Sequence, residues 1–263
     1  MTPSSPSPEN KAQPGSLYLV PAPLDFGCAE VVDLDASMPA GTLDAASRIS
    51  HWICENAKST RAYLKRIAES HPLCLPLQSM NLQELPREVH KKGDHGGGFD
   101  ARYLLQPALM GNAMGLVSEA GMPAVADPGS SVVRAAHDLG IPVVPLVGPV
   151  SLLLALAASG LNGQSFAFVG YVPAAPAERA QRIKELESLA LKTGQTQIFI
   201  ETPYRNGALL QTLVQSLQHN TRLATASGLT LGSAQCHSDT VKNWRQKPWV
   251  LDNNIPTVFA IGR

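Results

Sequence analysis

Two glutamates stand at the ends of apolar runs that predict strands, where a side chain can reach a bound molecule. Glu119 follows one such run and Glu201 ends another. A carboxylate in such a place can act as a general base, which typically speeds a reaction by about 10²- to 10⁴-fold. Glu55 is a third candidate, whereas Asp127 begins an Asp-Pro-Gly segment with turn chemistry. The alternative for each glutamate is a helix cap or an ion pair with a nearby arginine, which for Glu201 is Arg205.

Glycines next to predicted strand ends bring main chain within reach of a ligand. Gly121 precedes Met122, and Gly148 stands between a predicted strand and a predicted helix. A glycine permits close approach to its backbone, and free N–H groups at a helix start can contact a ligand. We therefore expect main-chain ligand contacts at these turns, with a plain strand-to-helix connection as the alternative at Gly148.

Residues 139–177 contain no formal charge, although 16% of the chain is charged. Crossing a bilayer takes about 20 apolar residues, but Pro142, Pro145, Gly148 and Pro149 interrupt this stretch. Its one helix-like run, 150–158, would be about 14 Å long, against a bilayer core of about 30 Å. We therefore expect the stretch to lie inside the protein or at an interface, and not in a membrane.

Composition limits the classes of partner. Lys+Arg and Asp+Glu both number 21, so the formal net charge is zero and an RNA-binding surface would have to be a local basic patch. The four cysteines lack metal-ligand spacing, and His90, Asp94 and His95 lie in a glycine-rich loop typical of a solvated segment, so we predict no metal. Residues 1–15 are rich in Pro and Ser without an apolar core, which predicts a disordered lead and a cytoplasmic protein.

Apolar runs and turn residues predict two successive α/β domains. The predicted strands cover 17–20, 51–54, 73–77, 113–117, 142–147, 166–172, 197–201, 222–227 and 256–261. The predicted helices cover 44–50, 57–70, 100–112, 130–139, 150–158, 179–192 and 206–217. Strand, glycine loop, helix and strand follow one another between residues 114 and 147, which indicates a βαβ unit and a parallel sheet. The predicted division is a lead at 1–15, a first α/β domain at 16–162 and a second at 163–263.

The glycine-rich segments, in their order, resemble those of the tetrapyrrole-methylase-like (class III) methyltransferases. They are Pro21-Ala-Pro-Leu24, Ser118-Glu-Ala-Gly-Met-Pro, Asp127-Pro-Gly, Pro145-Leu-Val-Gly-Pro-Val-Ser151, Phe166-Ala-Phe-Val-Gly-Tyr-Val-Pro173 and Glu201-Thr-Pro-Tyr-Arg205. Within that group the chain resembles the ribosomal RNA small subunit methyltransferase I family, over about residues 16–263. Each segment alone is weak, but the ordered set is highly specific.

The resemblance implies a tetrapyrrole-methylase-like fold of two α/β domains with a ligand cleft between them, in a homodimer. It implies S-adenosylmethionine as methyl donor and ribosomal RNA, or the small ribosomal subunit, as partner, with methylation of a ribose 2′-oxygen. Glu119 and Glu201 are then the candidate catalytic residues. Carried over by motif, the donor contacts are Pro23, Leu24, Gly121, Met122, Val125, Val150, Ser151, Tyr171, Ala226 and Pro256.

The chain departs from the family pattern at three places. The first loop continues Asp25-Phe26-Gly27 instead of Gly-Asn-Leu, the segment Glu-Asp-Thr-Arg is replaced by Glu55-Asn-Ala-Lys-Ser-Thr-Arg61, and Glu119 replaces an aspartate. These departures indicate a separate branch. Two alternatives therefore stay open: a methyltransferase acting on a small molecule such as a tetrapyrrole, and a catalytically silent protein that binds S-adenosylmethionine.

Overall fold

The computed structural model describes residues 13–92, 94, 96–247 and 249–263, so most of the predicted lead at 1–15 lies outside the described residues. The chain divides into two compact units. We call the part up to Ala22 with Met38–Gly148 the first unit, and Pro23–Ser37 with Pro149–Arg263 the second unit. Each is described by itself.

The first unit is built on a five-stranded sheet in which every pair of neighbouring strands is parallel. The strand order is β3-β2-β4-β1-β5. The strands are β1 Leu17–Leu19, β2 His51–Cys54, β3 Asn81–Glu84, β4 Met114–Val117 and β5 Val143–Pro145. The parallel sheet predicted from the βαβ order is confirmed.

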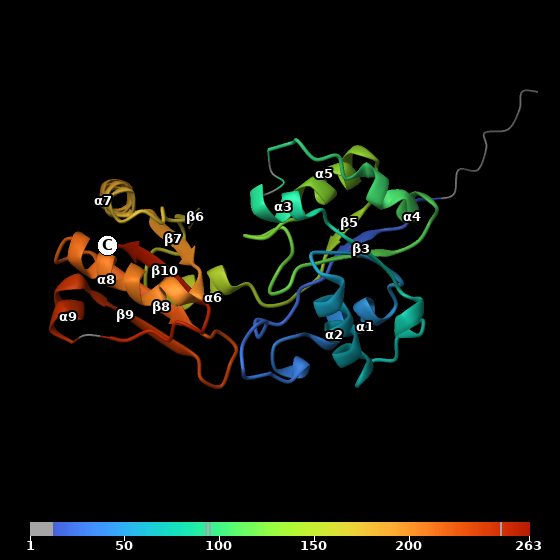
Figure 1. Cartoon of the computed structure of the whole chain (residues 1–263), viewed down its shortest axis with the longest axis horizontal. Coiled ribbons are helices and arrows are strands. Elements are labelled where there is room, and N and C mark those ends of the chain that lie inside the picture. The colour runs from blue at the N-terminus through green and yellow to red at the C-terminus, as the bar shows by residue number, and fades with distance from the viewer. Residues whose placement is uncertain (1–12, 93, 95, 248) are drawn as a thin grey trace, which may run out of the picture. The chain divides into compact units, whose positions relative to one another are not determined.

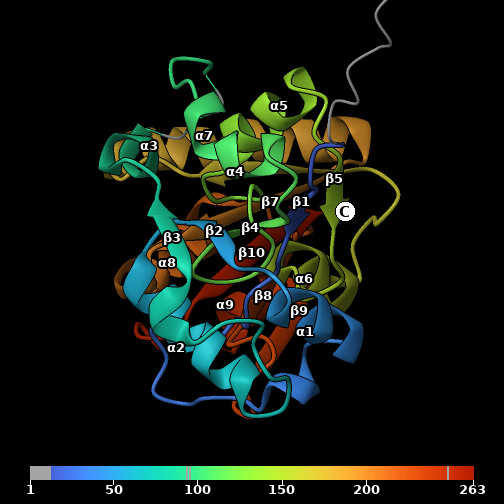
Figure 2. The ribbon, with the colours of Figure 1, turned by 90° about the vertical axis from the view of Figure 1, so that its right-hand side faces the viewer.

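Helices cover both faces of this sheet (Figures 1 and 2). They are α1 Ala40–Ser47, α2 Ala57–Ala68, α3 Arg87–Lys92, α4 Gln106–Leu109 and α5 Ser130–Asp138, with 3-10 turns at Leu77–Ser79 and Arg102–Leu105. Helices α1 and α2 lie on one side, and α4 and α5 on the other. Between the sheet and α5, Leu17, Met114 and Leu116 pack against Val132 and Ala136, and all five are fully buried. Because both faces are covered, the central strands read as continuous apolar runs.

The second unit has a mixed five-stranded sheet of order β6-β7-β10-β8-β9. Its strands are β6 Phe166–Tyr171, β7 Thr196–Glu201, β8 Arg222–Ser227, β9 Gln235–Thr240 and β10 Thr257–Gly262. Strands β6 and β7 are parallel, whereas β10 runs antiparallel to both β7 and β8, and β9 antiparallel to β8. The carboxyl ends of β6, β7 and β8 therefore lie at the same edge as the start of β10.

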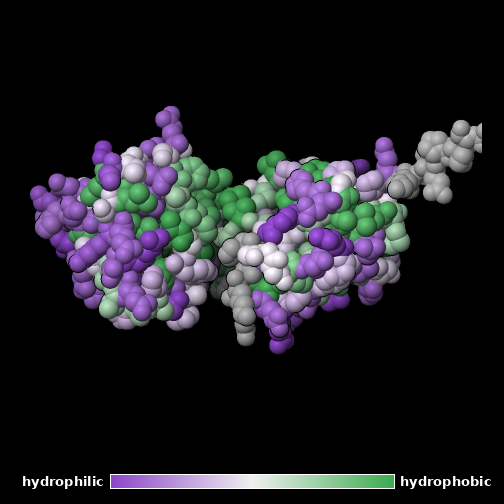
Figure 3. Space-filling model, turned by 90° about the horizontal axis from the view of Figure 1, so that it is seen from above, coloured by the Kyte–Doolittle hydropathy of each residue, from purple (hydrophilic) through white to green (hydrophobic). Residues whose placement is uncertain are grey.

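The helices of the second unit also form two layers (Figure 1). They are α6 Ser151–Ser159, α7 Pro176–Thr193, α8 Asn206–Ser216 and α9 Val241–Gln246, with 3-10 turns at Leu34–Ala36 and Pro203–Arg205. Phe199 and Phe259 face α7, α8 and α9, while their strand neighbours Ile198 and Val258 face α6. This alternation is the period-two pattern of a sheet buried on both faces. The face of this unit seen in Figure 3 (left) is largely hydrophilic, with apolar patches.

Helix α6 explains why this grouping differs from the predicted boundary near residue 162. Leu152, Ala155 and Leu156 of α6 pack on Ala224 and Ala260 of the second sheet. The inner face of α6, in the charge-free segment after Gly148, is therefore buried against the strands that follow it in sequence. From the order of elements in the sequence alone, α6 was predicted to belong to the first domain, with the strand that precedes it.

Some predicted elements were wrong and others were missed, and the reasons are physical. Residues 73–77 form no strand, and the sheet edge is instead β3. Both β3 and β9 are edge strands with polar sequences, Asn-Leu-Gln-Glu and Gln-Cys-His-Ser-Asp-Thr, which carry no apolar alternation to detect. The predicted helix at 100–112 is a 3-10 turn followed by the short α4, with Pro107 at its start.

No helix among the described residues is both long enough and apolar enough to span a bilayer. Helix α6, the most apolar run in the charge-free stretch, has nine residues. The predicted interior position holds for the buried face of α6, whereas residues 162–164 and 174–177 of the same stretch are exposed.

Candidate functional site

In the first unit, the loops that leave β1 and β4 are joined main chain to main chain. The N–H of Ala22 donates to the carbonyl of Gly121 at 2.9 Å, and the N–H of Gly121 donates back at 2.9 Å. Gly121 has a φ of 71°, a left-handed conformation that favours glycine. The close approach predicted at Gly121 is therefore made by another strand-end loop, and it fixes where Met122 and the following residues begin.

Gly148 has a similar role. A β-carbon at this position would lie 2.5 Å from Cβ of Pro21, so the missing side chain makes room for the loop after β1. The hydroxyl of Thr42 donates to the carbonyl of the preceding Val147 at 2.7 Å, and the hydroxyl of Tyr63 donates to the carbonyl of Pro21 at 2.8 Å. These contacts support the plain strand-to-helix alternative for Gly148, because its open side is filled by protein.

Three carboxylates gather after β2 and β4 of the first unit. The Glu55 carboxylate accepts the backbone N–H of Glu119 at 3.0 Å, and the Ser59 hydroxyl donates to the Glu119 carboxylate at 3.2 Å. Asp127 belongs to the same group. Its pKa is raised to about 7, first by burial and then by the charges of Glu55 and Glu119, while a hydrogen bond from Ser118 acts to lower it. A carboxyl group with such a pKa can gain or lose a proton at neutral pH.

Asn56 shows what the altered Glu55–Arg61 segment does locally. Its side-chain oxygen accepts the N–H of Lys58 at 2.8 Å and caps α2. Asparagine and aspartate cap helix starts about equally well. The helix start therefore tolerates the departure from the family pattern, and Glu55 keeps its place at the end of β2.

Asp94 serves the fold and lies apart from this group. Its carboxylate accepts the N–H groups of Gly129 and Ser131 and the hydroxyls of Ser130 and Ser131 at 2.6 to 2.9 Å. Burial opposes its ionisation, but these hydrogen bonds outweigh burial and lower the pKa to about 2. His95, which with His90 and Asp94 could suggest a metal site, lies outside the described residues. No group of three metal-ligating side chains occurs in the part that the structure describes.

In the second unit, four of the predicted residues lie along one edge of the sheet. Tyr171 pairs with Ile200, next to Glu201. Glu201 is opposite Thr257, which follows Pro256, and Ala226 is opposite the next residue of β10. The mixed sheet therefore brings Tyr171, Glu201, Ala226 and Pro256 to a common edge, where strand ends collect ligands in α/β proteins.

Glu201 is the most deeply buried carboxylate of that edge. One carboxylate oxygen accepts from the Arg205 guanidinium at 2.6 Å and from the N–H of Thr202 at 2.7 Å. The Glu201 side chain is 0% exposed and the Arg205 side chain 30%. The ion pair considered for Glu201 is thus formed. The contact raises the pKa of Arg205 through its hydrogen bond to Glu201.

Several polar atoms beside Glu201 are buried without a partner among the described residues. They are the second carboxylate oxygen of Glu201, Nε of Arg205 and the side-chain oxygen of Asn206. The Asn206 amide group donates to the carbonyl of Ile255 at 2.9 Å and to the hydroxyl of Thr257 at 3.1 Å. Buried acceptors are normally satisfied. This edge therefore has the chemistry to accept hydrogen bonds from a ligand's hydroxyl or ammonium groups.

The other predicted donor contacts differ in accessibility. Gly121, Met122 and Val125 belong to the first unit, and Val125 is an exposed apolar side chain. Pro23, Leu24, Val150 and Ser151 belong to the second unit, with Val150 at the N-cap of α6. Ala226 is buried in the apolar layer beneath α6, whereas Tyr171 is exposed. Thr257 and Asn206 were missed, and no apolar periodicity or motif distinguishes them in the sequence.

The sequence is similar to those of several proteins named ribosomal RNA small subunit methyltransferase I. No family model matches the chain. The ribosomal RNA small subunit methyltransferase I of Vibrio cholerae serotype O1 is 36% identical over 137 residues, which are 52% of this chain and 46% of that protein. The protein of the same name from Mesorhizobium japonicum is 29% identical over 227 residues, 86% of this chain and 68% of that protein. The chain thus spans about half the length of the Vibrio relative that it matches.

Among solved structures, the methyltransferase CobJ shares the fold. Its TM-score is 0.55 at 15% sequence identity, with 95% of this chain and 94% of that chain covered. At this identity the likeness concerns the fold alone. Together with the two sheets and their helices, it confirms the predicted fold class of two α/β units of the tetrapyrrole-methylase type.

Proposed function

We propose that this chain, a relative of the ribosomal RNA small subunit methyltransferase I proteins, is a methyltransferase that uses S-adenosylmethionine and acts on RNA. The observation that carries the proposal is the sequence similarity to curated proteins of that name, which extends over 86% of the chain in one case. Ribosomal RNA in the small subunit is the proposed substrate and a ribose 2′-oxygen the proposed acceptor. A ribosomal substrate places the protein in the cytoplasm.

The residues proposed to hold the donor belong to both units. In the first unit they are Gly121, Met122 and Val125, and in the second Pro23, Leu24, Val150, Ser151, Tyr171, Ala226 and Pro256. The unpartnered acceptor atoms of Glu201 and Asn206 fit a ligand that offers ribose hydroxyls or an ammonium group. Donor binding at the second-unit edge would satisfy these atoms, which otherwise cost free energy as buried polar groups.

The donor supplies a methyl group already activated on a sulfonium, so the protein's main task is to align the acceptor with it. We propose Glu119 and Glu201 as catalytic residues that take the proton from the acceptor hydroxyl. Glu119 is favoured of the two, because one oxygen of Glu201 is held by Arg205. The carboxyl of Asp127, with its pKa of about 7, can take up a proton in the same group as Glu119.

Labelled methyl transfer tests the proposal. Small ribosomal subunits purified from a strain that lacks this protein should accept labelled methyl from S-adenosylmethionine, and subunits from the parent strain should not. Unlabelled subunits, with donor binding intact by calorimetry, would shift the proposal to a small-molecule substrate such as a tetrapyrrole or to a silent donor-binding protein. If the chain did not bind S-adenosylmethionine at millimolar concentration, the proposal that it uses this methyl donor would be disproved.

Two conservative variants test the catalytic residues. Glu119→Gln should lower the transfer rate by about 10²-fold, the usual contribution of a general base, and should leave donor affinity unchanged. Glu201→Gln should lower the rate less. The exposed Glu178→Gln on α7 serves as the matched control. Unchanged rates in both site variants would make both glutamates structural.

We further propose that the chain forms a homodimer. On α6, Leu153, Leu154, Ala157 and Ala158 form an exposed, uncharged face opposite the buried one, and the two leucines are 50% and 40% exposed. Such a face in a charge-free segment is typical of an interface. Light scattering should give twice the mass of 27.9 kDa, and Leu153→Glu should give the single mass. A monomeric parent chain would contradict the dimer.

A further inference from the structure

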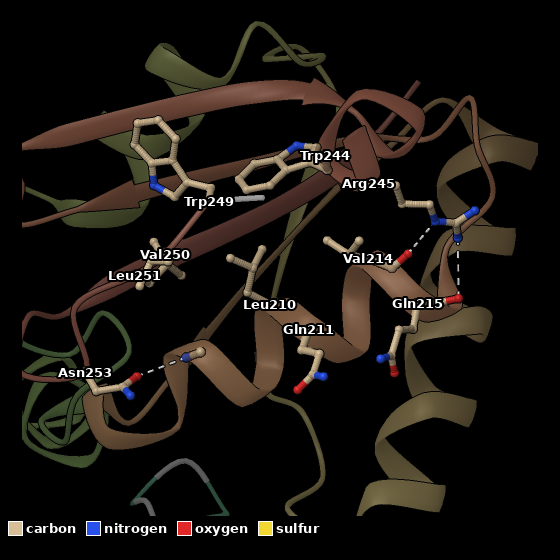
Figure 4. Close-up of a pocket in the computed structure, with 11 residues that line it drawn as sticks. Leu210, Gln211, Val214, Gln215, Trp244, Arg245, Trp249, Val250, Leu251 and Asn253 are labelled. Atoms are coloured by element: carbon tan, nitrogen blue, oxygen red, sulfur yellow. Dashed lines mark hydrogen bonds between the residues drawn. The ribbon is translucent and has the colours of Figure 1, made fainter. Parts of the chain in front are cut away.

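A separate apolar pocket lies in the second unit, between α8, α9 and the segment 249–253 (Figure 4). Its volume is about 470 Å³, within the range of small-molecule sites. Leu210 and Val214 of α8 point toward the indoles of Trp244 and Trp249, which lie on the opposite side of the pocket. None of the residues considered above for the donor or the proton transfer lines this pocket.

The aromatic wall is held in place before any ligand arrives. His237 of β9 stacks on Trp249 with ring centres 4.8 Å apart and an interplanar angle of 3°. The same imidazole meets Trp244 edge to face at 4.6 Å, and the Trp244 ring N–H donates to the carbonyl of Leu223 at 3.0 Å. Trp249 is nevertheless 38% exposed. A fixed, partly exposed indole is a platform on which another flat ring can stack.

The polar groups of the pocket are neutral or already engaged. Arg245 is the one charged side chain among the described residues of the lining, and its guanidinium donates to the carbonyls of Val214 and Leu217, each at 2.9 Å. Gln211 and Gln215 are exposed on α8, and their side chains point away from the two indoles (Figure 4). Among the described residues of this lining a phosphate would find no free cation, whereas a flat, uncharged ring would find an aromatic platform.

We propose that this pocket binds an unstacked nucleobase of single-stranded RNA. Proteins recognise single-stranded RNA by stacking its bases on aromatic side chains and by hydrogen-bonding the base edges. Lys242 and Lys247, which are exposed within and just after α9, supply the neighbouring positive charge that a phosphate backbone needs. The inference deepens the proposed function, since it rests on RNA being the substrate, and it assigns the pocket to substrate positioning outside the reacting centre.

Two measurements on the full chain test the pocket. A short single-stranded RNA carrying 5-iodouridine should crosslink to Trp249 on irradiation, as located by mass spectrometry. In anisotropy titrations with the same RNA, Trp249→Ala should weaken binding about 10-fold, in the range that loss of one base–aromatic stack gives. Trp249→Phe should stay within about 3-fold of the parent chain, and Tyr103→Ala, which removes an exposed aromatic ring of the first unit, should not change the affinity.

A Val250→Ser variant covers the case in which Trp249→Ala does not fold, because Val250 lines the pocket and is 88% exposed. It should weaken binding about 3-fold. Parent-like RNA affinity in the folded variants, or crosslinks confined to residues outside the pocket, would overturn the proposal. Weaker binding to small ribosomal subunits with unchanged binding to naked RNA would also overturn it and would assign the pocket to a protein side chain.

The outcome is separable from that of the proposed function. If the parent chain and Trp249→Ala methylate subunits equally well, the proposed function stands and the role of the pocket is disproved. If the chain crosslinks to RNA at Trp249 but binds no S-adenosylmethionine, the pocket proposal stands and the proposed function is disproved.

Discussion

Glu119 of the first unit and Glu201 of the second stand at comparable places, each at the carboxyl end of a strand, yet their surroundings differ. Glu119 is grouped with two further carboxyls, Glu55 and Asp127. Its carboxylate accepts from the Ser59 hydroxyl, and its backbone N–H donates to the Glu55 carboxylate. Glu201 is fully buried and paired with Arg205. One strand end therefore concentrates negative charge, and the other neutralises it.

The difference separates two tasks that a carboxylate can perform. Burial, and then the charge of neighbouring carboxylates, raises the pKa of a carboxyl group, and the pKa of Asp127 in the first unit is accordingly about 7. A carboxylate held by a guanidinium is a firm structural anchor. We therefore expect Glu119 to contribute more to proton transfer than Glu201, and the Glu201–Arg205 pair also to order the loop after β7.

The largest effect is expected from breaking the buried pair. Glu201→Ala should lower the free energy of unfolding by about 3 kcal/mol, because it leaves the Arg205 charge without its partner. Urea denaturation measures this. The exposed Asp44–Arg48 pair has the same spacing of four residues, with side chains 50% and 74% exposed, and serves as the matched control. Asp44→Ala should cost less than 1 kcal/mol. Equal losses in the two variants would show that burial does not distinguish the pairs.

Asp94 is the intermediate case, a buried carboxylate stabilised by hydrogen bonds from the described residues Gly129, Ser130 and Ser131. Its pKa falls from an ordinary 3.8 to about 2, so its contribution to stability is present above about pH 4 and is lost as the pH falls toward 2. Asp94→Asn should cost about 2 kcal/mol at pH 7. Urea midpoints of the parent and variant chains should converge between pH 4 and 2. A difference that stays constant across this interval would mean that the charge is not what stabilises the α5 start.

Much of the fold follows from the sequence, because the central elements carry strong apolar patterns. Strand β2 and the start of α2 lie where predicted, and α2, with a buried Leu64 and Ile67, shows the expected spacing. The edge strands β3 and β9 could not be found this way, since an edge needs few buried side chains. The placement of α6 depends on which sheet its apolar face meets, and a local pattern cannot specify that.

The candidate site, like the fold, was predicted from the sequence only in part. Motif order located Glu119, Gly121 and Glu201 at strand ends, and the arginine beside Glu201 was visible as a neighbour four residues on. The raised pKa of Asp127 could not be predicted, because it depends first on burial and then on Glu55, which lies far away in the sequence and close in space. The Trp249 pocket was missed as well. Its wall joins β9, α9 and a loop that no single motif connects.

A smaller effect of opposite sign is expected at Asp127. Its folded pKa of about 7 lies above the ordinary 3.8, so the folded chain holds a proton that the unfolded chain releases, and stability falls as the pH rises from 4 to 7. Asp127→Asn removes this penalty. The variant should match the parent chain at pH 4 and exceed its stability by about 1 to 2 kcal/mol above pH 7, a figure reduced for partial solvent screening. Urea midpoints across this range decide it, and a variant less stable than the parent at pH 8 would contradict the expected sign.

The smallest effect separates the members of the first-unit group. After burial, the charge of Glu55 is the strongest cause that raises the pKa of Asp127, and the charge of Glu119 is weaker. Glu55→Gln should therefore move the pKa of Asp127 from about 7 toward its ordinary value, with Glu119→Gln moving it less, and neither should change stability by more than about 1 kcal/mol. Carbon NMR titration of the Asp127 carboxyl measures both shifts. If Glu119→Gln gave the larger one, Glu119 and Asp127 would be the coupled pair, and the proton on Asp127 would report directly on the residue proposed as the base.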